Sequence, residues 1–465
     1  MKTATVLAAF LATASLHAAV IRQVIVRQQW PWSTDIKVEY KLAEVTNAVD
    51  ISVKAFNGDV ELDNSKLAES ITGDLYGISE SGIGQFIIDP VKAFGNAKVA
   101  IADFRVELEV TDSATNINEP LYKILCLTNG VIENVTRADL LNGRYGSIET
   151  DYSKLGSGFT TQLSDVLIWT GVTNDVKYKS THMVLRKIPA KDRSFKFQKG
   201  NSSVNGGAGV DVLFTNDFYI GVFEVTQAQF ANTTAHPYGG SNETNAQYAA
   251  YRPVNRVPFG KNYYTSLRGY SSGRIWPEGD HVTVDASSYF GKLQASTKVV
   301  LDLPTEAMWE FACRAMSAND DLYTGNASSD AQASLIMRAF HINCVNEGVT
   351  TPKLNAPTAP PNCDLTDGPA WVGSYMPNAW GLYDMLGNIW EFCLDRYGPI
   401  GTDALVDPRG PAEYSTANMR VLRGGAYNIA RNACLCYARD TLSDVDAYRQ
   451  VGFRVCLYPD AEVSE

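Results

Sequence analysis

The chain has 465 residues, which is long for a single hydrophobic core and sufficient for two or three domains. With 45% hydrophobic and 20% charged residues, its composition is that of a folded protein. The net charge of −11 argues against a nucleic-acid partner, because nucleic-acid-binding faces carry an excess of lysine and arginine.

Residues 1–19 follow the plan of a secretory signal peptide. Lys2 gives a basic start, an apolar run extends from Val6 to Ala12, and small residues stand at Ala18 and Ala19. This segment is too short to span a bilayer, and no later stretch is apolar for long enough. We therefore expect a protein without a transmembrane segment that is secreted, periplasmic or held at the cell surface. The alternative is an N-terminal helix that is retained.

Export permits disulfide bonds, and the sequence contains eight cysteines. No two of them form a CxxC pair, so zinc-ribbon and thioredoxin-like sites have no support in the pattern. Cys434 and Cys436 form a CxC pair, whose thiols would point to one face of a strand. The other cysteines are Cys126, Cys313, Cys344, Cys363, Cys393 and Cys456.

Residues 20–112 alternate apolar and polar side chains with a period of two, and clusters of Gly, Asn and Asp interrupt the pattern. The clearest strands are expected at 35–42, 49–56, 98–104 and 105–112. Short strands at this spacing predict an all-β sandwich of the immunoglobulin-like kind. Its expected role is to space or present the region that follows, and an independent binding role is the alternative.

A β-rich connector is expected at 113–183, with strands at 121–128 and 165–172. A strand at 183–190 then opens a long, aromatic and loop-rich domain that extends to about residue 460. One helix is expected in this domain, at 304–317. Pro304 suits its first turn and Glu306 its dipole. Its apolar stripe consists of Met308, Phe311, Ala312 and Ala315.

Five segments of this domain carry a family resemblance. They read FYIGVFEVTQAQF (218–230), LPTEAMWEFACRA (303–315), NAWGLYDMLGNIWEFC (378–393), RVLRGGAYN (420–428) and VGFRV (451–455). In this order they make residues 184–460 similar to the formylglycine-generating enzymes, also called sulfatase-modifying factors. The resemblance implies an α+β fold like that of C-type lectins, with a small twisted sheet, few helices and long packed loops.

The resemblance also implies a calcium site in the segment 378–393. Its ligands would be the side chains of Asp384 and Glu391 and the carbonyls of Gly387 and Ile389. From the residues alone, Asp384 and Glu391 are two hard oxygen donors separated by a Gly-Asn turn, as calcium prefers. The alternative is that Asp384 caps a turn and Glu391 pairs with an arginine.

Two further charges, Glu310 and Arg454, lie inside apolar runs. Charges in such positions are usually paired when they are buried, so we expect one or both in a buried ion pair.

The family's oxidases convert a cysteine of a sulfatase to formylglycine with oxygen and copper. Copper(I) is soft and prefers thiolates, and the enzymes provide two cysteines soon after a Gly-Gly-Ser motif. By this resemblance the first cysteine falls on Ile429, the second on Cys434 and the serine on Ala426. Cys434 is thus the one catalytic candidate, and Cys436 could supply a second sulfur only with an altered loop.

Cys434 and Cys436 could also have a structural role in a disulfide. The resemblance implies that Cys313 forms a disulfide with a cysteine of this C-terminal segment, which would leave at most one free thiol there. A bridge between Cys344 and Cys363, across the loop they enclose, is also open.

These observations predict a secreted protein with a sulfatase-modifying-factor-like domain whose copper-oxidase site is degenerate. Its expected role is ligand binding or scaffolding, with an unknown protein or glycan as partner. The alternative is a divergent oxidoreductase that uses copper(I) and acts on a peptidyl cysteine of a sulfatase.

A second alternative comes from residues 420–455. Both ends match the family, whereas the sequence between them mixes Tyr, Asn, Asp, Ser, Ala, Ile and Leu. This mixture of residues resembles that of the variable proteins whose coding sequences diversity-generating retroelements alter at adenines. Tyrosine and small polar residues are also what binding loops use. The candidate ligand-surface residues are Tyr427, Asn428, Ile429, Tyr437, Leu442 and Tyr448.

Overall fold

The computed structural model divides the chain into two compact units. One comprises Met1–Leu121 and Val135–Ile148, and the other Tyr122–Asn134 and Glu149–Glu465. The described residues are 19–28, 33–64, 66–95, 104–114, 116–151, 166–235, 250–260, 266–269, 276, 283–317, 319–323, 333, 335–339, 368–411 and 418–462. The predicted signal peptide up to residue 18, most of the expected strand at 98–104, and Cys344 and Cys363 lie outside these residues.

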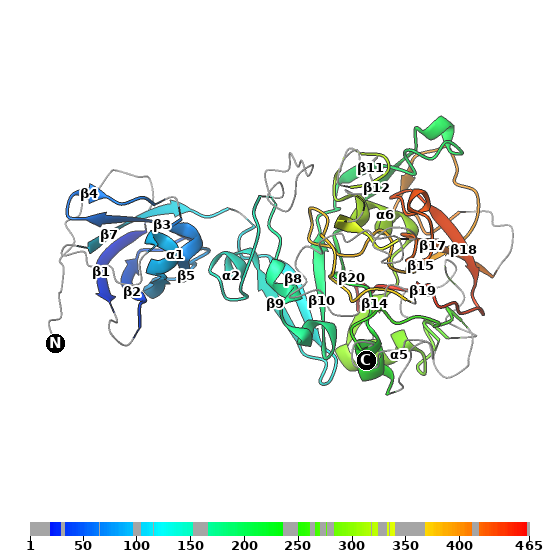
Figure 1. The fold of residues 1–465 in the computed structure, drawn as a ribbon, viewed down its shortest axis with the longest axis horizontal. Coiled ribbons are helices and arrows are strands. Elements are labelled where there is room, and N and C mark those ends of the chain that lie inside the picture. Colours follow the sequence, from blue (N-terminus) through cyan, green and yellow to red (C-terminus); the bar gives the residue numbers. More distant parts are fainter. Residues whose placement is uncertain are drawn as a thin grey trace, which may run out of the picture. The chain divides into compact units, whose positions relative to one another are not determined.

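The N-terminal unit contains two antiparallel sheets, in the orders β1-β2-β6-β5 and β4-β3-β7. Their strands are β1 (Val20–Gln28), β2 (Ile36–Ala43), β3 (Val49–Asn57), β4 (Val60–Glu61), β5 (Ile71–Gly73), β6 (Gly82–Ile88) and β7 (Phe104–Asp112). Figure 1 shows these strands in blue to cyan. The predicted alternation is realised in β2, where Val38 and Tyr40 are buried and Lys41 is exposed. Val38 and Phe86 from one sheet and Ile51 and Val106 from the other belong to one hydrophobic core.

Two short helices complete this unit, α1 (Pro90–Phe94) and α2 (Arg137–Leu141). Asp89 caps α1 through the main-chain N–H groups of Val91 and Lys92, and Pro90 occupies its first turn. Thr136 and Asp139 form a reciprocal capping box at the start of α2.

The C-terminal unit is built from three sheets, in the orders β14-β20-β13-β10-β8-β9, β18-β17-β15-β19 and β11-β12-β16. The first sheet contains β8 (Pro120–Cys126), β9 (Ile132–Thr136), β10 (His182–Ile188), β13 (Phe218–Gly221), β14 (Val299–Asp302) and β20 (Cys456–Glu462). The second contains β15 (Trp390–Arg396), β17 (Met419–Arg423), β18 (Arg439–Ser443) and β19 (Val451–Gly452). The third contains β11 (Arg193–Phe197), β12 (Val210–Phe214) and β16 (Leu405–Val406).

The predicted boundaries at residues 112 and 183 do not coincide with the observed units. Strand β8 pairs with β10 from Tyr122 to Cys126, so the first expected strand of the connector joins the sheet of the C-terminal unit. The second expected strand, 165–172, was a wrong prediction for most of its length. Within its described part, 166–172, only Ile168 forms a bridge, with Glu149, and Thr170–Thr173 form a 3-10 turn. Its apolar residues reflect burial of an irregular segment, because Leu167, Ile168 and Trp169 are almost fully buried without a strand ladder.

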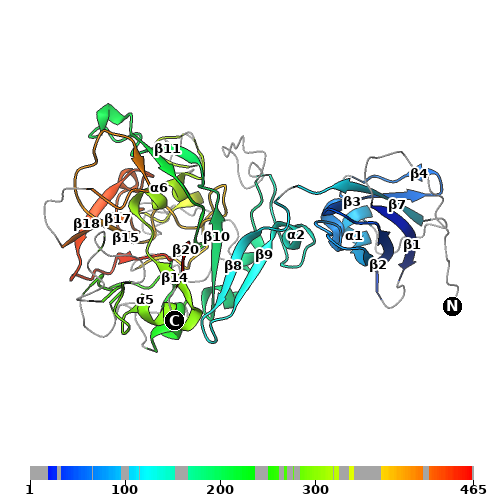
Figure 2. The ribbon, with the colours of Figure 1, turned by 180° about the vertical axis from the view of Figure 1, so that it is seen from behind.

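Helices are few in the described part of this unit: α3 (Gln227–Thr234), α5 (Tyr289–Thr297) and α6 (Glu306–Arg314). The predicted helix at 304–317 is confirmed in α6, but Thr305 is its N-cap and Pro304 precedes the cap. Every residue of α6 is buried. The helix packs against β11, β15 and β17, as Figure 1 and Figure 2 show from opposite sides. Among the described residues, no helix combines the length and apolar character needed to cross a membrane.

Candidate functional site

The segment 378–393 is a series of tight turns that leads into β15. Gly381, Asp384, Gly387 and Asn388 all have positive φ, between 56° and 77°. A side chain at Gly387 would place its Cβ 2.4 Å from the carbonyl oxygen of Arg338, so this turn requires glycine. Side chains satisfy much of the main chain that the turns leave unpaired.

Asn378 is the clearest example of this satisfaction by a side chain. Its Oδ1 accepts from the main-chain N–H groups of Trp380 and Leu382, at 3.0 and 3.1 Å, and its Nδ2 donates to the Ala312 carbonyl at 2.7 Å. Trp380 and Trp390, which flank the turns, are buried and fill the space between loops.

Glu391 and Arg454 form a buried, two-pronged ion pair below this segment. Arg454 donates from Nε to Oε2 and from Nη2 to Oε1 of Glu391, both at 2.6 Å. Trp309 donates its indole N–H to the same Oε2 at 2.7 Å. The guanidinium also donates to the carbonyls of Gly221 and Tyr383, at 2.9 and 3.0 Å. The expectation that Arg454 is paired is confirmed.

Glu310 is the centre of a second buried cluster. It accepts from the main-chain N–H and the side-chain amide of Gln198, both at 2.9 Å. Arg314 donates to Oε1 at 2.9 Å and Arg423 to Oε2 at 2.5 Å. Glu310 and Arg454 are therefore both paired, as expected, but in separate clusters.

Glu224 is a buried carboxylate that the sequence analysis missed. Its Oε2 accepts from the Asn388 side chain at 2.6 Å, and its Oε1 from the Ile389 N–H at 3.3 Å. Burial raises its pKa well above the usual range, and the charges of Asp384 and Glu391 raise it further. The signal was available in the run FEVT, where a glutamate lies among apolar residues as Glu310 does.

The predicted calcium ligands are only partly suited to a cation. Asp384 is buried, and its Oδ1 has no hydrogen-bond partner among the described residues, whereas Oδ2 accepts from the Gly373 N–H at 2.6 Å. Burial raises the Asp384 pKa to about 7, although the Gly373 N–H and the Arg454 charge lower it. Glu391, however, uses both oxygens for Arg454 and Trp309. As arranged, Glu391 is paired with an arginine, which is the alternative given above, and only Asp384 keeps a side-chain oxygen without a partner among the described residues.

Cys434 lies in a closed environment behind the Gly424-Gly425 turn. A Cβ on Gly425 would lie 2.3 Å from the Cys434 Sγ, so the close approach depends on this glycine. Cys434 is fully buried, and burial raises its pKa to about 12. Cys434 is thus a neutral thiol. Ile429, at the other expected cysteine position, is half-buried and packs against the core.

The structure brings a different pair of sulfurs together. Cys313 on α6 and Cys436 before β18 have Sγ atoms 3.6 Å apart, and both residues are fully buried. All described cysteines are free thiols. Within the described parts of the chain, no group of three or more His, Cys, Asp or Glu side chains is arranged to hold a metal ion.

The predicted ligand-surface residues come from the loops around β18. Tyr427, Asn428 and Ile429 follow β17 and are half-buried. Tyr437 precedes β18 and is also half-buried, whereas Tyr448 is 51% exposed.

Leu442 does not belong to this surface. It pairs with Arg420 across the sheet and is buried in the hydrophobic core, with 4% of its surface exposed. Successive side chains of a strand point to opposite faces, and residue 442 falls on the inner face of β18. Its inclusion as a surface residue was wrong.

Comparisons with known proteins agree with the resemblance. Residues 194–458 match the family described as "Sulfatase-modifying factor enzyme 1-like domain". The formylglycine-generating enzyme of Thermomonospora curvata is 31% identical over 282 residues, which are 56% of this chain and 83% of that protein. The formylglycine-generating enzyme of Streptomyces coelicolor is 32% identical over 161 residues, which are 33% of this chain and 45% of that protein.

The match therefore spans less than half of the Streptomyces relative's length. Among solved structures, Treponema denticola variable protein 1 is similar over 60% of this chain and 96% of that chain, with 21% identity and a TM-score of 0.42.

Proposed function

Because the chain belongs to the sulfatase-modifying factor enzyme 1-like domain family, we propose that it uses this fold as an exported binding or scaffold domain and not as a copper oxidase. The observation that carries the proposal is the pair of positions where the family's copper ligands fall. Ile429 has no sulfur, and Cys434 is a fully buried thiol whose pKa is raised to about 12. Copper(I) binds thiolates, so a single protonated thiol behind a closed turn is a poor ligand set.

The binding role is supported by the loops that carry Tyr427, Asn428, Tyr437 and Tyr448. Their side chains are partly or largely exposed, and the loops are anchored beneath. The Tyr427 N–H donates to the Asn388 carbonyl at 2.8 Å, and the Arg256 N–H donates to the Tyr448 carbonyl at 3.2 Å. Anchored loops whose tyrosines are partly exposed lose little conformational entropy on binding, which suits a protein or glycan partner.

A divergent oxidase is the second candidate, and it is favoured by relatives that are named formylglycine-generating enzymes. We expect the full chain, supplied with copper(I) and oxygen, to leave a peptide with the sulfatase cysteine motif unchanged in mass. The Cys434→Ser variant should behave identically. The Ile429→Cys variant restores the two-cysteine spacing and serves as the comparison for copper(I) affinity. Conversion of the peptide thiol to an aldehyde by the natural chain, but not by Cys434→Ser, would establish the oxidase instead.

Diversification by a retroelement is supported by the mixed residues around β18. A near-identical template repeat and a reverse-transcriptase gene beside the coding sequence are expected in that case. A gene neighbourhood without either would remove this alternative and leave a binding surface of fixed sequence. Secretion, which the first 19 residues support, predicts that the exported protein lacks these residues, as its intact mass would reveal.

Calcium binding at Asp384 stays a prediction. It is supported by one oxygen, Oδ1, which has no hydrogen-bond partner among the described residues and could contact the ion. If calcium binds, the melting temperature should be higher with calcium than with a chelator, because a ligand that binds only the folded state stabilises that state. Asp384→Asn should then abolish the rise. The same melting temperature with calcium and with chelator would leave Glu391 assigned to Arg454 alone.

We further propose a disulfide between Cys313 and Cys436 in the exported protein. Their sulfurs are 3.6 Å apart, against about 2.05 Å in a disulfide, so a small side-chain movement suffices. Two thiols would lose two protons and two electrons to a thiol–disulfide oxidant of the export compartment. The bond is expected to add about 2–4 kcal/mol to the free energy of unfolding.

Peptide mapping without reductant tests this bond. The linked peptide should be absent from Cys313→Ser and from Cys436→Ser, and present in Cys434→Ser, which is the matched control. A linked peptide that contains Cys434 in place of Cys436 would contradict the proposed pairing.

A further inference from the structure

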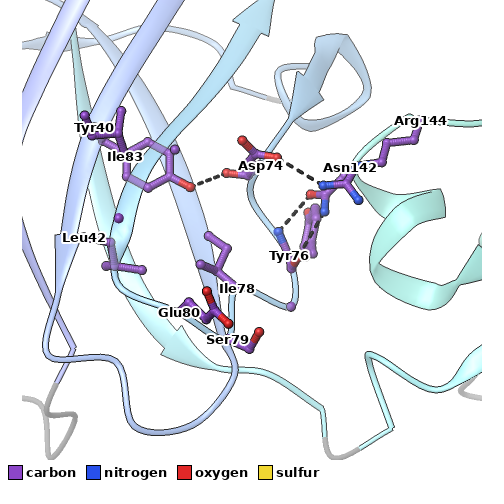
Figure 3. Close-up of a pocket in the computed structure, with 13 residues that line it drawn as sticks. Tyr40, Leu42, Asp74, Tyr76, Ile78, Ser79, Glu80, Ile83, Asn142 and Arg144 are labelled. Atoms are coloured by element: carbon purple, nitrogen blue, oxygen red, sulfur yellow. Dashed lines mark hydrogen bonds and ion pairs between the residues drawn. The ribbon is translucent and has the colours of Figure 1, made fainter.

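The N-terminal unit contains a polar pocket of about 430 Å³, within the range of small-ligand sites. It lies where the chain leaves β5 and returns into β6, and Figure 3 shows the side chains that line it. Tyr40 and Leu42 contribute from β2, the segment 74–80 forms a wall, and Asn142 and Arg144 reach it from the end of α2. All of these residues belong to the N-terminal unit.

Two glycines of β6 shape the pocket: Gly84 admits the Tyr40 ring, and Gly82 leaves open space. Phe86 and Ile88 fill the interior along the same face of the strand, whereas Gly82 and Gly84 present no side chain there. A Cβ on Gly84 would lie 2.2 Å from the Tyr40 hydroxyl, so this glycine admits the tyrosine ring. A Cβ on Gly82 would meet nothing within 4 Å. The volume that a side chain at 82 would occupy is therefore open.

The pocket wall is held in place without a ligand. The Asn142 Oδ1 accepts from the N–H groups of Leu75 and Tyr76, at 2.8 and 2.9 Å, and its Nδ2 donates to the Tyr76 carbonyl at 3.0 Å. The Tyr40 hydroxyl donates to the Asp74 carbonyl at 2.5 Å. A preformed wall lowers the entropic cost of binding.

The charges around the pocket favour a cation. The positive charge of Arg144 is balanced by ion pairs with Asp139 at 2.6 Å and Asp74 at 3.3 Å. Glu80 is exposed and makes no hydrogen bond or ion pair with a described residue. Tyr40 and Tyr76 stay neutral, because burial raises the pKa of each, as do the charges of nearby Asp74 and Asp50. The carboxylates of Asp74, Asp139 and Glu80 thus outnumber the one arginine.

Among the described residues, no strand pairs with β6 at Ile83 on the side where β5 lies. Strand β5 pairs with β6 only from Phe86 to Ile88. Beyond β5, Asp74 makes hydrogen bonds to both main-chain groups of Gln85. The Asp74 N–H donates to the Gln85 carbonyl at 2.8 Å, and the Asp74 Oδ2 accepts from the Gln85 N–H at 3.3 Å. Alternate residues of a strand direct their main-chain groups to the same side, so those of Ile83 face the same side as those of Gln85. Ile83 is 80% exposed.

We propose that this pocket receives a lysine or arginine side chain from an extended peptide partner, whose main chain pairs with Ile83 at the edge of β6. Main-chain pairing at a sheet edge supplies affinity, and the side-chain pocket supplies specificity. Glu80 provides the acceptor for the cationic head, and Leu42 and Ile78 contact its apolar stem.

The test uses the full chain and two capped tripeptides, acetyl-Val-Lys-Val-amide and the same peptide with norleucine in place of lysine. Calorimetry should give an affinity about tenfold higher for the lysine peptide than for the norleucine peptide. The affinity for the lysine peptide should decrease as the salt concentration rises from about 50 mM to about 500 mM, because the contact is ionic. Glu80→Gln should weaken the lysine peptide alone. Gly82→Phe should abolish binding of both peptides.

Gly401→Phe is the matched control, because a Cβ there also meets nothing within 4 Å and the residue belongs to the other unit. It should bind as the natural chain does, and both phenylalanine variants should melt at the natural temperature. Equal affinity for lysine and norleucine, no detectable binding of the lysine peptide, or unaltered binding by Gly82→Phe would overturn the proposal. Binding of free 1,5-diaminopentane as tightly as the peptide would overturn the role of the Ile83 main chain.

Discussion

Replacing Arg454 with methionine is expected to lower the free energy of unfolding of the C-terminal unit by about 3–5 kcal/mol. The guanidinium makes two contacts of 2.6 Å with Glu391 and satisfies the carbonyls of Gly221 and Tyr383. Methionine fills the volume but leaves Glu391 buried and uncompensated, near Glu224 and Asp384. Urea unfolding followed by tryptophan fluorescence measures the loss, since all tryptophans except Trp30 and Trp32 lie in this unit.

The matched control is Lys196→Met. Lys196 pairs with Asp211 at 2.7 Å in the same unit, but the two side chains are 49% and 56% exposed. Exposed pairs contribute about 0–1 kcal/mol, so this variant should unfold close to the natural chain. Equal urea midpoints for Arg454→Met and Lys196→Met would contradict the central position given to the Glu391–Arg454 pair.

Replacing Glu310 with alanine should cost a similar amount, about 3–5 kcal/mol, through a different cluster. Its carboxylate balances Arg423, whose side chain is completely buried, and also accepts from Arg314 and Gln198. Removal takes the nearer of two carboxylates from Arg423, since Glu306 lies 3.6 Å from its Nε, and leaves the Gln198 donors without their acceptor. The same urea measurement applies.

Glu310→Gln separates the charge from the hydrogen bonds, because the amide keeps one acceptor oxygen and removes the negative charge. A loss close to that of alanine is expected if the charge dominates. Asp211→Ala, at the exposed pair with Lys196, is the control and should change little. A Glu310→Ala variant as stable as Asp211→Ala would show that Arg314 and Arg423 are satisfied in another way.

These clusters explain how a unit with few helices keeps its long loops in place. Loop main chain cannot be satisfied by ladders, so buried side chains supply the missing partners. Asn378 joins one turn to α6, and Glu224 joins the next turn, at Asn388 and Ile389, to the segment that follows β13. Arg454 joins β13 to β15 through Gly221 and Glu391. Of these residues, Arg454 was expected from the sequence to be buried and paired, whereas Glu224 was missed.

The partner of Cys313 could not be predicted from the sequence. The family resemblance pointed to Cys434 and Ile429 as the informative positions, but it left the partner of Cys313 open between Cys434 and Cys436. The structure places Cys436, and not Cys434, 3.6 Å from Cys313. Sequence separation of 123 residues carries no information on such a contact, since loop packing in three dimensions decides it.

The sequence by itself indicated the family, an N-terminal region rich in β-strands, the helix around Trp309 and the burial of Glu310 and Arg454. The family rests on the resemblance of five motifs. The strands, the helix and the buried charges follow from local periodicity, from the residues at the start of the helix and from the cost of burying a charge, all of which are read within a few residues.

Only the tertiary structure decided which carboxylate Arg454 pairs with, that β8 joins the sheet of the C-terminal unit, that Leu442 faces inward, and that Gly82 opens a pocket. These depend on which segments meet across long loops. A contact of that kind is fixed by the packing of the whole unit, and the residues on either side of it in the chain are compatible with several partners.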